Sequence, residues 1–196
     1  MTMGGRSSRA LWAAKLAGKS TGQGTPEPIA PGLRPAFTGR IIGIDPSVRA
    51  TGIAVVEFIR RNEGRLLYSA TLRMPQKLSL YECIGRVSTA VAQVVADYKP
   101  TSAAIEQTVY IQNFQTAHNL GAMRGATIVP LAQAGIPVNE YAPLRIKQAV
   151  SGGRASKEQV AAQVKALLGL PEALPFDESD AAATALCHAY TAAISL

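Results

Sequence analysis

The chain has 196 residues, 47% of them hydrophobic, and a formal net charge of +7. This length predicts one domain with an added tail, and the apolar fraction is sufficient for a core. No apolar run approaches the roughly 20 residues of a membrane-spanning helix, so we expect no membrane partner. The two cysteines, Cys83 and Cys187, belong to no CxxC pair or His cluster. We expect buried thiols in a reducing compartment, which disfavours a disulfide scaffold.

The positive charge is concentrated in the first 40 residues, which hold six basic residues against one acid and net +5, whereas the remainder nets +2. Gly, Ser, Pro and basic residues dominate this segment, and such a composition buries too little surface to offset chain entropy. We therefore predict a disordered basic extension over residues 1–40 and a globular domain over 41–196. The extension fits a DNA-contacting arm, an organelle transit peptide or a variable segment without a specific role.

The globular part opens with three predicted strands. The apolar run Ile41–Ile44 ends in Asp45 and is typical of a buried central strand. A stretch rich in turn residues follows it. β-rich segments then occupy Ile53–Ile59 and Leu66–Leu72, with a turn predicted at 61–64. These strands form a meander.

Helices and strands alternate in the remainder of the chain. The predicted elements are a helix over 80–98, a strand over 103–106, a helix over 115–133, a strand over 137–141, a helix that follows Ser156 and ends at Gly169, and a helix over 177–194. Pro130 should kink the second of these helices or start a new segment, because its ring removes a backbone donor. The order predicts an α/β fold: a mixed five-stranded sheet, three antiparallel strands and then parallel strands, with helices on both faces.

Four carboxylates stand where a shared site is expected. Asp45 ends the first predicted strand and Glu106 ends the fourth, and strand ends in open α/β sheets border ligand crevices. Asp177 and Asp180 share one face at the start of the last helix. If the first and fourth strands are parallel neighbours, all four acids converge. Glu178 is expected to point off that face into solvent.

Clustered carboxylates repel one another unless a cation neutralises them. An oxygen-only set without His or Cys favours Mg²⁺, with Mn²⁺ as the alternative. Two such ions about 3.5–4 Å apart suit phosphodiester cleavage. Each acid also has a structural interpretation: Asp45 and Glu106 as strand-end acids that face water, Asp177 as a helix N-cap, and Asp180 as a favourable charge in the first turn.

Six stretches in unbroken order resemble motifs of RuvC-type Holliday-junction resolvases. They are 41–56 (IIGIDPSVRATGIAVV), 103–107 (AAIEQ), 120–125 (LGAMRG), 140–150 (EYAPLRIKQAV), 155–160 (ASKEQV) and 177–189 (DESDAAATALCHA). The resemblance implies a ribonuclease-H-like fold and a homodimer that grips a four-way DNA junction and makes paired cuts with 5′-phosphate ends, in recombination and repair. It also implies a branch-migration helicase complex as a partner. The expected location is cytoplasmic and nucleoid-associated, unless the extension directs organelle import.

Motif matching assigns roles residue by residue. The resemblance implies that two metal ions per active site are held by Asp45, Glu106, Asp177 and Asp180. Two lysines match residues that contact DNA near the scissile phosphate and complete the catalytic set: Lys147 and Lys157. The other residues expected to bind DNA are Gln107, Tyr110, Arg124 and Arg154. For Arg124, an ion pair that anchors its helix is the alternative.

Three positions depart from the family pattern. Ser47 stands where the family has Gly, which is tolerable unless the turn needs a positive φ. Val109 replaces an aromatic residue that wedges bases at the crossover, and Tyr110 offers a stacking ring beside it. The segment 151–154 is about one residue short, and Arg154 compensates there as a phosphate contact.

Three other functions stay open. The loop from Asp45 to Gly52 resembles the phosphate loop of actin-like and sugar-kinase ATPases, but those proteins need a second lobe for which this chain has no room. A non-catalytic junction-binding protein on the same fold would be favoured by the loss of a metal acid, and all four are present. The Val109 departure keeps open a ribonuclease-H-like nuclease that acts on flaps or RNA.

Overall fold

The computed structural model describes residues 37–60, 63–108 and 113–192. These residues belong to one unit, Arg34–Leu196. The disorder of residues 1–36 therefore stays a prediction, whereas Gly39 and Arg40 already belong to the first strand, Gly39–Asp45, so the predicted domain boundary at residue 41 is two residues late. Val109 and Tyr110 lie outside the described residues.

Five strands form one mixed sheet in the order β3-β2-β1-β4-β5. Their bounds are β1 Gly39–Asp45, β2 Ala50–Arg60, β3 Glu63–Arg73, β4 Ser102–Glu106 and β5 Val138–Tyr141. The first three strands pair antiparallel, whereas β1 with β4 and β4 with β5 pair parallel. The predicted sheet is therefore confirmed. The turn predicted at 61–64 is wrong in part, because Glu63 and Gly64 already belong to β3.

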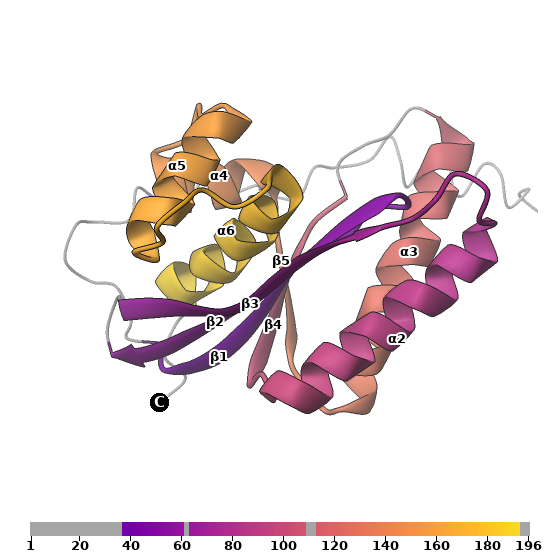
Figure 1. Ribbon diagram of the computed structural model, residues 1–196, viewed down its shortest axis with the longest axis horizontal. Coiled ribbons are helices and arrows are strands. Elements are labelled where there is room, and N and C mark those ends of the chain that lie inside the picture. The colour runs from indigo at the N-terminus through magenta and orange to yellow at the C-terminus, as the bar shows by residue number, and fades with distance from the viewer. Residues whose placement is uncertain (1–36, 61–62, 109–112, 193–196) are drawn as a thin grey trace, which may run out of the picture. The chain divides into compact units, whose positions relative to one another are not determined.

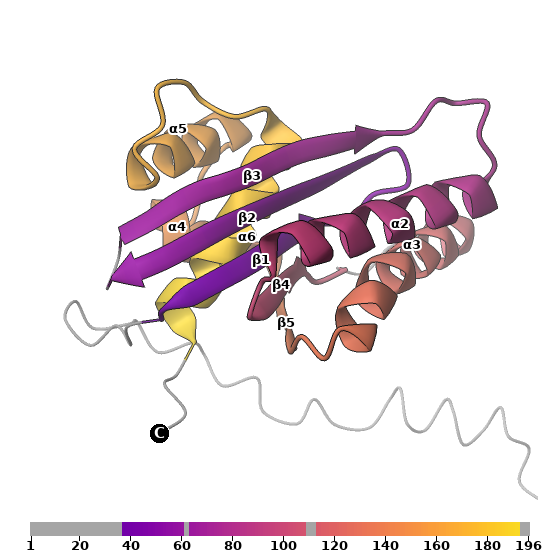
Figure 2. The same cartoon turned by 60° about the horizontal axis from the view of Figure 1, so that its bottom comes forward.

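Helices cover both faces of this sheet (Figures 1 and 2). On one face lie α2 (Leu80–Tyr98) and α3 (Phe114–Gln133), and on the other lie α4 (Pro143–Ser151), α5 (Lys157–Leu167) and α6 (Phe176–Thr191). Successive strand residues point to opposite faces. Ile42 and Ile44 of β1 accordingly pack in the cluster with α2 and α3, and Ile41 packs in the cluster with α6.

Local sequence sets several helix ends. Ser79 and Glu82 form a capping box at the start of α2, and Lys99 ends that helix with φ 47, before Pro100. Ser156 caps α5 in the same way with Gln159. These boundaries follow the sequence prediction closely, because each depends on side chains within one turn.

Three helix predictions need correction. α4 was not predicted; it has only 9 residues and begins at Pro143, whose fixed φ suits a first helical position. α3 continues past Pro130 to Gln133, so no new segment starts at that proline. α6 ends at Thr191, with Ala192 as its C-cap, which is earlier than the predicted end of this helix.

Both thiols are free and buried, at Cys83 and Cys187, as the sequence predicts. Among the described residues, no helix is both long and apolar enough to cross a membrane.

α6 lies directly on the backbone of β1 and β2, because two glycines leave room for it. A Cβ atom at Gly43 would lie 2.0 Å from the carbonyl oxygen of Ala181, and one at Gly52 would lie 2.0 Å from that of Asp177. Gly52 is also the cross-strand partner of Asp45. The first turn of α6 is therefore fixed beside the carboxyl end of β1.

We expect Gly43→Ala to lower the free energy of unfolding by about 1–3 kcal/mol or more, because the added methyl group overlaps helix backbone that cannot move aside. Urea unfolding measures this loss. Gly85→Ala is the matched control: the site is exposed on α2 with nothing within 4 Å of the new Cβ. That variant should be about 0.5–1 kcal/mol more stable than wild type. Equal stability of the two variants would contradict the packing argument.

Candidate active site

Asp45 and Glu106 emerge side by side from the sheet. β1 and β4 are parallel neighbours, and Ile44 is in register with Ile105. The acids are the next residue of each strand, so they leave the sheet at the same edge. The adjacency expected from the two strand ends is therefore present in the structure.

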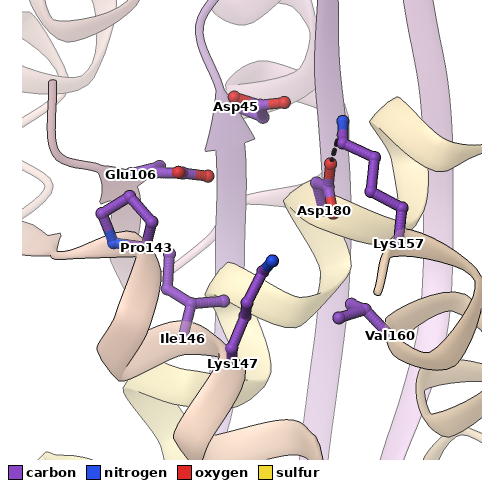
Figure 3. A pocket seen from close by; sticks show the side chains of 8 residues that line it. All are labelled: Asp45, Glu106, Pro143, Ile146, Lys147, Lys157, Val160 and Asp180. Atoms are coloured by element: carbon purple, nitrogen blue, oxygen red, sulfur yellow. Dashed lines mark hydrogen bonds and ion pairs between the residues drawn. The ribbon is translucent and has the colours of Figure 1, made fainter. Parts of the chain in front are cut away.

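Helices from the other half of the chain complete a pocket at this edge. Figure 3 shows its charged side chains directed toward a common space. The charged lining consists of Asp45 from β1, Glu106 from β4, Lys147 from α4, Lys157 from α5 and Asp180 from α6. Pro143, Ile146 and Val160 form its apolar wall. Five elements thus bring three acids and two lysines to one place.

Asp177 is near the pocket but does not line it. Its backbone carbonyl lies against Gly52, and its charge acts on both Asp45 and Lys157. The N-cap interpretation of Asp177 is wrong, because α6 begins at Phe176 and its N-cap is Pro175. Asp177 therefore influences the site through its charge, although its side chain does not line the pocket.

Glu178 does not point into solvent, which corrects the sequence expectation. It is half-buried, and its Oε2 accepts a hydrogen bond of 2.6 Å from the Ser69 hydroxyl on β3. The expectation failed because β3 passes close to the first turn of α6, which helix periodicity alone does not reveal.

Burial and neighbouring carboxylates raise the pKa of two of the acids, Asp45 and Glu106. Burial, followed by the charges of Glu106 and Asp180, raises the pKa of Asp45 from 3.8 to about 7. Burial and then the charge of Asp180 also raise the pKa of Glu106. A site in which neighbouring carboxylates resist ionisation has a strong affinity for positive charge.

The two lysines supply part of that charge. Lys157 Nζ donates a hydrogen bond of 3.1 Å to Asp180 Oδ2, and this contact raises the pKa of Lys157. Lys147 Nζ donates to the carbonyl oxygen of Ala155 at 3.0 Å, which ties α4 to the segment before α5. Both ammonium groups therefore have fixed positions at the pocket.

The chemistry of the donor atoms suits a hard divalent cation. The carboxylates are oxygen ligands, and burial together with the charges of Glu106 and Asp180 raises the pKa of Asp45, so a cation beside this acid would be favoured. Within the described part of the chain, however, no three acidic, His or Cys side chains are close enough to hold an ion together. Asp180 contacts Lys157 instead, so a cation that uses Oδ2 must share that oxygen with the ammonium group or displace it.

Arg124 adopts the anchoring arrangement. Its Nη1 donates to the main-chain carbonyl oxygen of Glu106, and its Nη2 pairs with Glu140 at 2.5 Å. Only 14% of the side chain is exposed, so the guanidinium group faces protein. Gln107 and Arg154, which were also expected to bind DNA, are exposed.

Ser47 fits its turn without strain. Among the described residues, Lys99 alone has a positive φ without being a glycine. The turn after Asp45 therefore needs no left-handed backbone at Ser47. The Ser47 carbonyl oxygen accepts a 2.7 Å hydrogen bond from the buried Thr51 hydroxyl. The departure from the family glycine is thus accommodated.

Comparison with known proteins agrees with this architecture. The family model described as Crossover junction endodeoxyribonuclease RuvC matches residues 41–188. This chain belongs to the RuvC family. RuvC of Halorhodospira halophila (strain DSM 244 / SL1) is 46% identical over 152 residues, which are 77% of this chain and 90% of that protein. The mixed sheet with helices on both faces is the ribonuclease-H-like fold of RuvC.

Two solved structures share the fold. "T. thermophilus RuvC in complex with Holliday junction substrate" is 34% identical, with a TM-score of 0.73, and the match covers 78% of this chain and 93% of that chain. The yeast mitochondrial Holliday junction resolvase is 10% identical with a TM-score of 0.56, and covers 80% of this chain and 82% of that chain. The second likeness concerns the fold alone.

Sequence reasoning missed the apolar members of the pocket. Pro143 and Ile146 belong to α4, and without a predicted helix there the directions of their side chains could not be predicted. Val160 lies three residues after Lys157 on α5, and that helical spacing is the signal that identifies it. Glu140, the partner of Arg124, lies in a quoted motif, but its contact depends on the packing of α3 against β5.

The raised pKa of Asp45 predicts how the stability of the metal-free protein depends on pH. Between about pH 4 and pH 7 the folded state binds a proton that the unfolded state has lost, so stability falls as pH rises through this range. We expect Asp45→Asn to flatten that fall and to stabilise the protein at pH 8 by roughly 1–3 kcal/mol. Urea unfolding in chelator at pH 5 and pH 8 measures both effects.

Asp97→Asn, on the exposed surface of α2, is the control and should keep the wild-type dependence. A wild-type slope in Asp45→Asn would show that the carboxylates do not interact as described.

Proposed function

We propose that this chain is a structure-selective endonuclease that resolves four-way DNA junctions by paired phosphodiester cleavage in recombination and repair. The observation that carries the proposal is the pocket in which Asp45, Glu106 and Asp180 meet Lys147 and Lys157. The complex of T. thermophilus RuvC with Holliday junction substrate supports the choice of DNA. Membership of the RuvC family disfavours the ATPase and the non-catalytic alternatives.

The lysines and the carboxylates of the pocket have different roles toward the phosphodiester. Lys147 and Lys157 are cations at the rim of an acidic pocket, where they attract and orient a phosphate that the carboxylates alone would repel. Ile146 and Val160 offer no polar group to the pocket, so the polar contacts of a bound phosphate come from the acids and the lysines. Asp45, whose pKa burial and neighbouring charges raise to about 7, is one of the acids that line the pocket.

We further propose Mg²⁺ as the cofactor, with Mn²⁺ as a substitute and two ions per site. The ligands would be Asp45, Glu106, Asp177 and Asp180. Bound divalent cations supply the positive charge that activates an attacking water and stabilises the leaving 3′-oxygen. The support is the oxygen-only chemistry of these side chains and the raised pKa of Asp45, to which burial and then the charges of Glu106 and Asp180 contribute.

A homodimer is the proposed working form, since paired cuts across a four-way junction need two sites. A branch-migration helicase complex is the proposed partner, and a cytoplasmic, nucleoid-associated location is the proposed setting. Analytical ultracentrifugation of the full chain, alone and with a synthetic junction, tests the dimer.

A flap or RNA nuclease is the remaining alternative. The proposal is tested by a Mg²⁺-dependent nicking assay that compares a synthetic four-way junction, a flap, linear duplex DNA and an RNA–DNA hybrid, with mapped product ends. Symmetric nicks with 5′-phosphate ends on the junction support it. Preferred cutting of the flap or the hybrid would instead establish the alternative.

We expect Asp45→Asn to abolish junction nicking, because it removes a carboxylate from the centre of the site, while junction affinity stays near the wild-type value. The loss should be at least about a thousandfold in rate. Nicking in Mg²⁺ and electrophoretic mobility shift in chelator measure the two effects. Cleavage by the variant at the wild-type rate would remove Asp45 from the metal site.

We expect Lys147→Ala to slow nicking or weaken junction binding about tenfold, because a fixed cation beside the phosphate is lost. The slope of log affinity against log salt should fall by about one phosphate contact if the effect is on binding. Lys165→Ala, near the end of α5 and away from the pocket lining, is the matched control. An unchanged rate and salt slope would exclude Lys147 from the site.

A further inference from the structure

Glu178 connects the acidic turn of α6 to the edge strand of the sheet. Its Oε2 accepts a 2.6 Å hydrogen bond from the Ser69 hydroxyl, and its Oε1 accepts a longer one, 3.4 Å, from the Thr71 hydroxyl. Ser69 and Thr71 alternate along β3 and pair across the sheet with Ala54 and Gly52. They therefore lie on the face of the sheet that α6 covers.

Glu178 lies between two acids of the candidate site, so its contact with β3 bears on their position. Glu178 directly follows Asp177 and lies two residues before Asp180. Glu178 thus bonds the sheet, whereas Asp177 in the same turn contributes charge to the pocket and Asp180 at the start of the next turn lines it. Ser69 and Thr71 themselves do not line that pocket.

The first turn of α6 needs such a restraint for two reasons. Its N-cap is Pro175, which makes no side-chain capping hydrogen bond. This end of α6 also carries Asp177 in its first turn and Asp180 just after it, whose negative charges repel that of Asp45 and raise its pKa. Repulsion pushes the turn away from β1, and a helix end without a side-chain cap frays readily.

We propose that Glu178 is a positioning residue for the nuclease site: through Ser69 and Thr71 it holds the first turn of α6 at the distance from β1 that places Asp180 opposite Asp45. This inference rests on the proposed function. Glu178 touches neither DNA nor reacting atoms in this role. It acts through the helix, together with the backbone contact at Gly52.

The test is a double-mutant cycle of Glu178→Ala and Ser69→Ala in the full chain. Each single variant should slow single-turnover junction nicking at saturating Mg²⁺ by roughly tenfold, the lower end of the effects seen for residues that orient metal ligands. The double variant should be no slower than Glu178→Ala alone, because both changes remove the same contact. Junction affinity in chelator should stay within about twofold of wild type.

Two further variants separate positioning from general stability. Glu178→Gln keeps an oxygen acceptor for Ser69 and should restore most of the rate. Glu57→Gln is the matched control: Glu57 is also a half-buried carboxylate with two partners, Arg40 and Arg65, but it lies on β2 away from the pocket. It should keep the wild-type rate even where thermal unfolding shows that it is less stable.

Additive losses in the cycle, or a wild-type rate for both single variants, would overturn the positioning role. If Glu178→Ala fails to fold, Ser69→Ala and Glu178→Gln decide the question, and a wild-type rate for Ser69→Ala overturns the proposal. A failure of the proposed function gives a different result: the wild-type protein itself does not cut the junction. A failure of the positioning role alone leaves wild-type cutting intact and the variants equally fast.

Discussion

The direct contact between the backbone of α6 and the backbone of the sheet is the constraint on which the site depends. Side chains normally separate a helix from a sheet, but at Gly43 and Gly52 there are none, and the carbonyl oxygens of Ala181 and Asp177 occupy the space. Backbone contacts leave little freedom in height or rotation. This packing, together with the hydrogen bonds of Glu178 to β3, therefore places Asp180, one helical turn into α6, near the end of β1.

That packing works against electrostatics. It brings Asp180 toward Asp45 and Glu106, and the resulting repulsion and burial raise the pKa of both of those acids. Folding free energy from the two hydrophobic clusters holds the acids together, and Lys157 offsets part of the repulsion at Asp180. The negative side chains are thus already in place before a cation binds, which is a form of electrostatic preorganisation.

Much of this could be predicted from the sequence, for physical reasons. Asp45 and Glu106 follow apolar strands whose period and length are local properties, and parallel pairing then puts both acids at one edge. The parts that failed depend on contacts between distant segments. α4 is too short to show a clear period, and the hydrogen bond of Glu178 joins residues 109 positions apart. The sequence identifies Arg124 as a cation, but its contact with the Glu106 carbonyl oxygen depends on how α3 packs and could not be predicted.

The Arg124 contact shows that the site is held from both faces of the sheet. α6 positions Asp180 from one face, whereas α3 lies on the other and sends Arg124 to the end of β4, where Nη1 binds the main-chain oxygen of Glu106. The distance between the two acids therefore depends on the packing of two separate hydrophobic clusters across one layer of strands. Because protein interiors are close-packed, a change of volume in either cluster is transmitted to the strand ends. Large core side chains of β1, such as Ile42 and Ile44, thus contribute to the geometry of a pocket that they do not line.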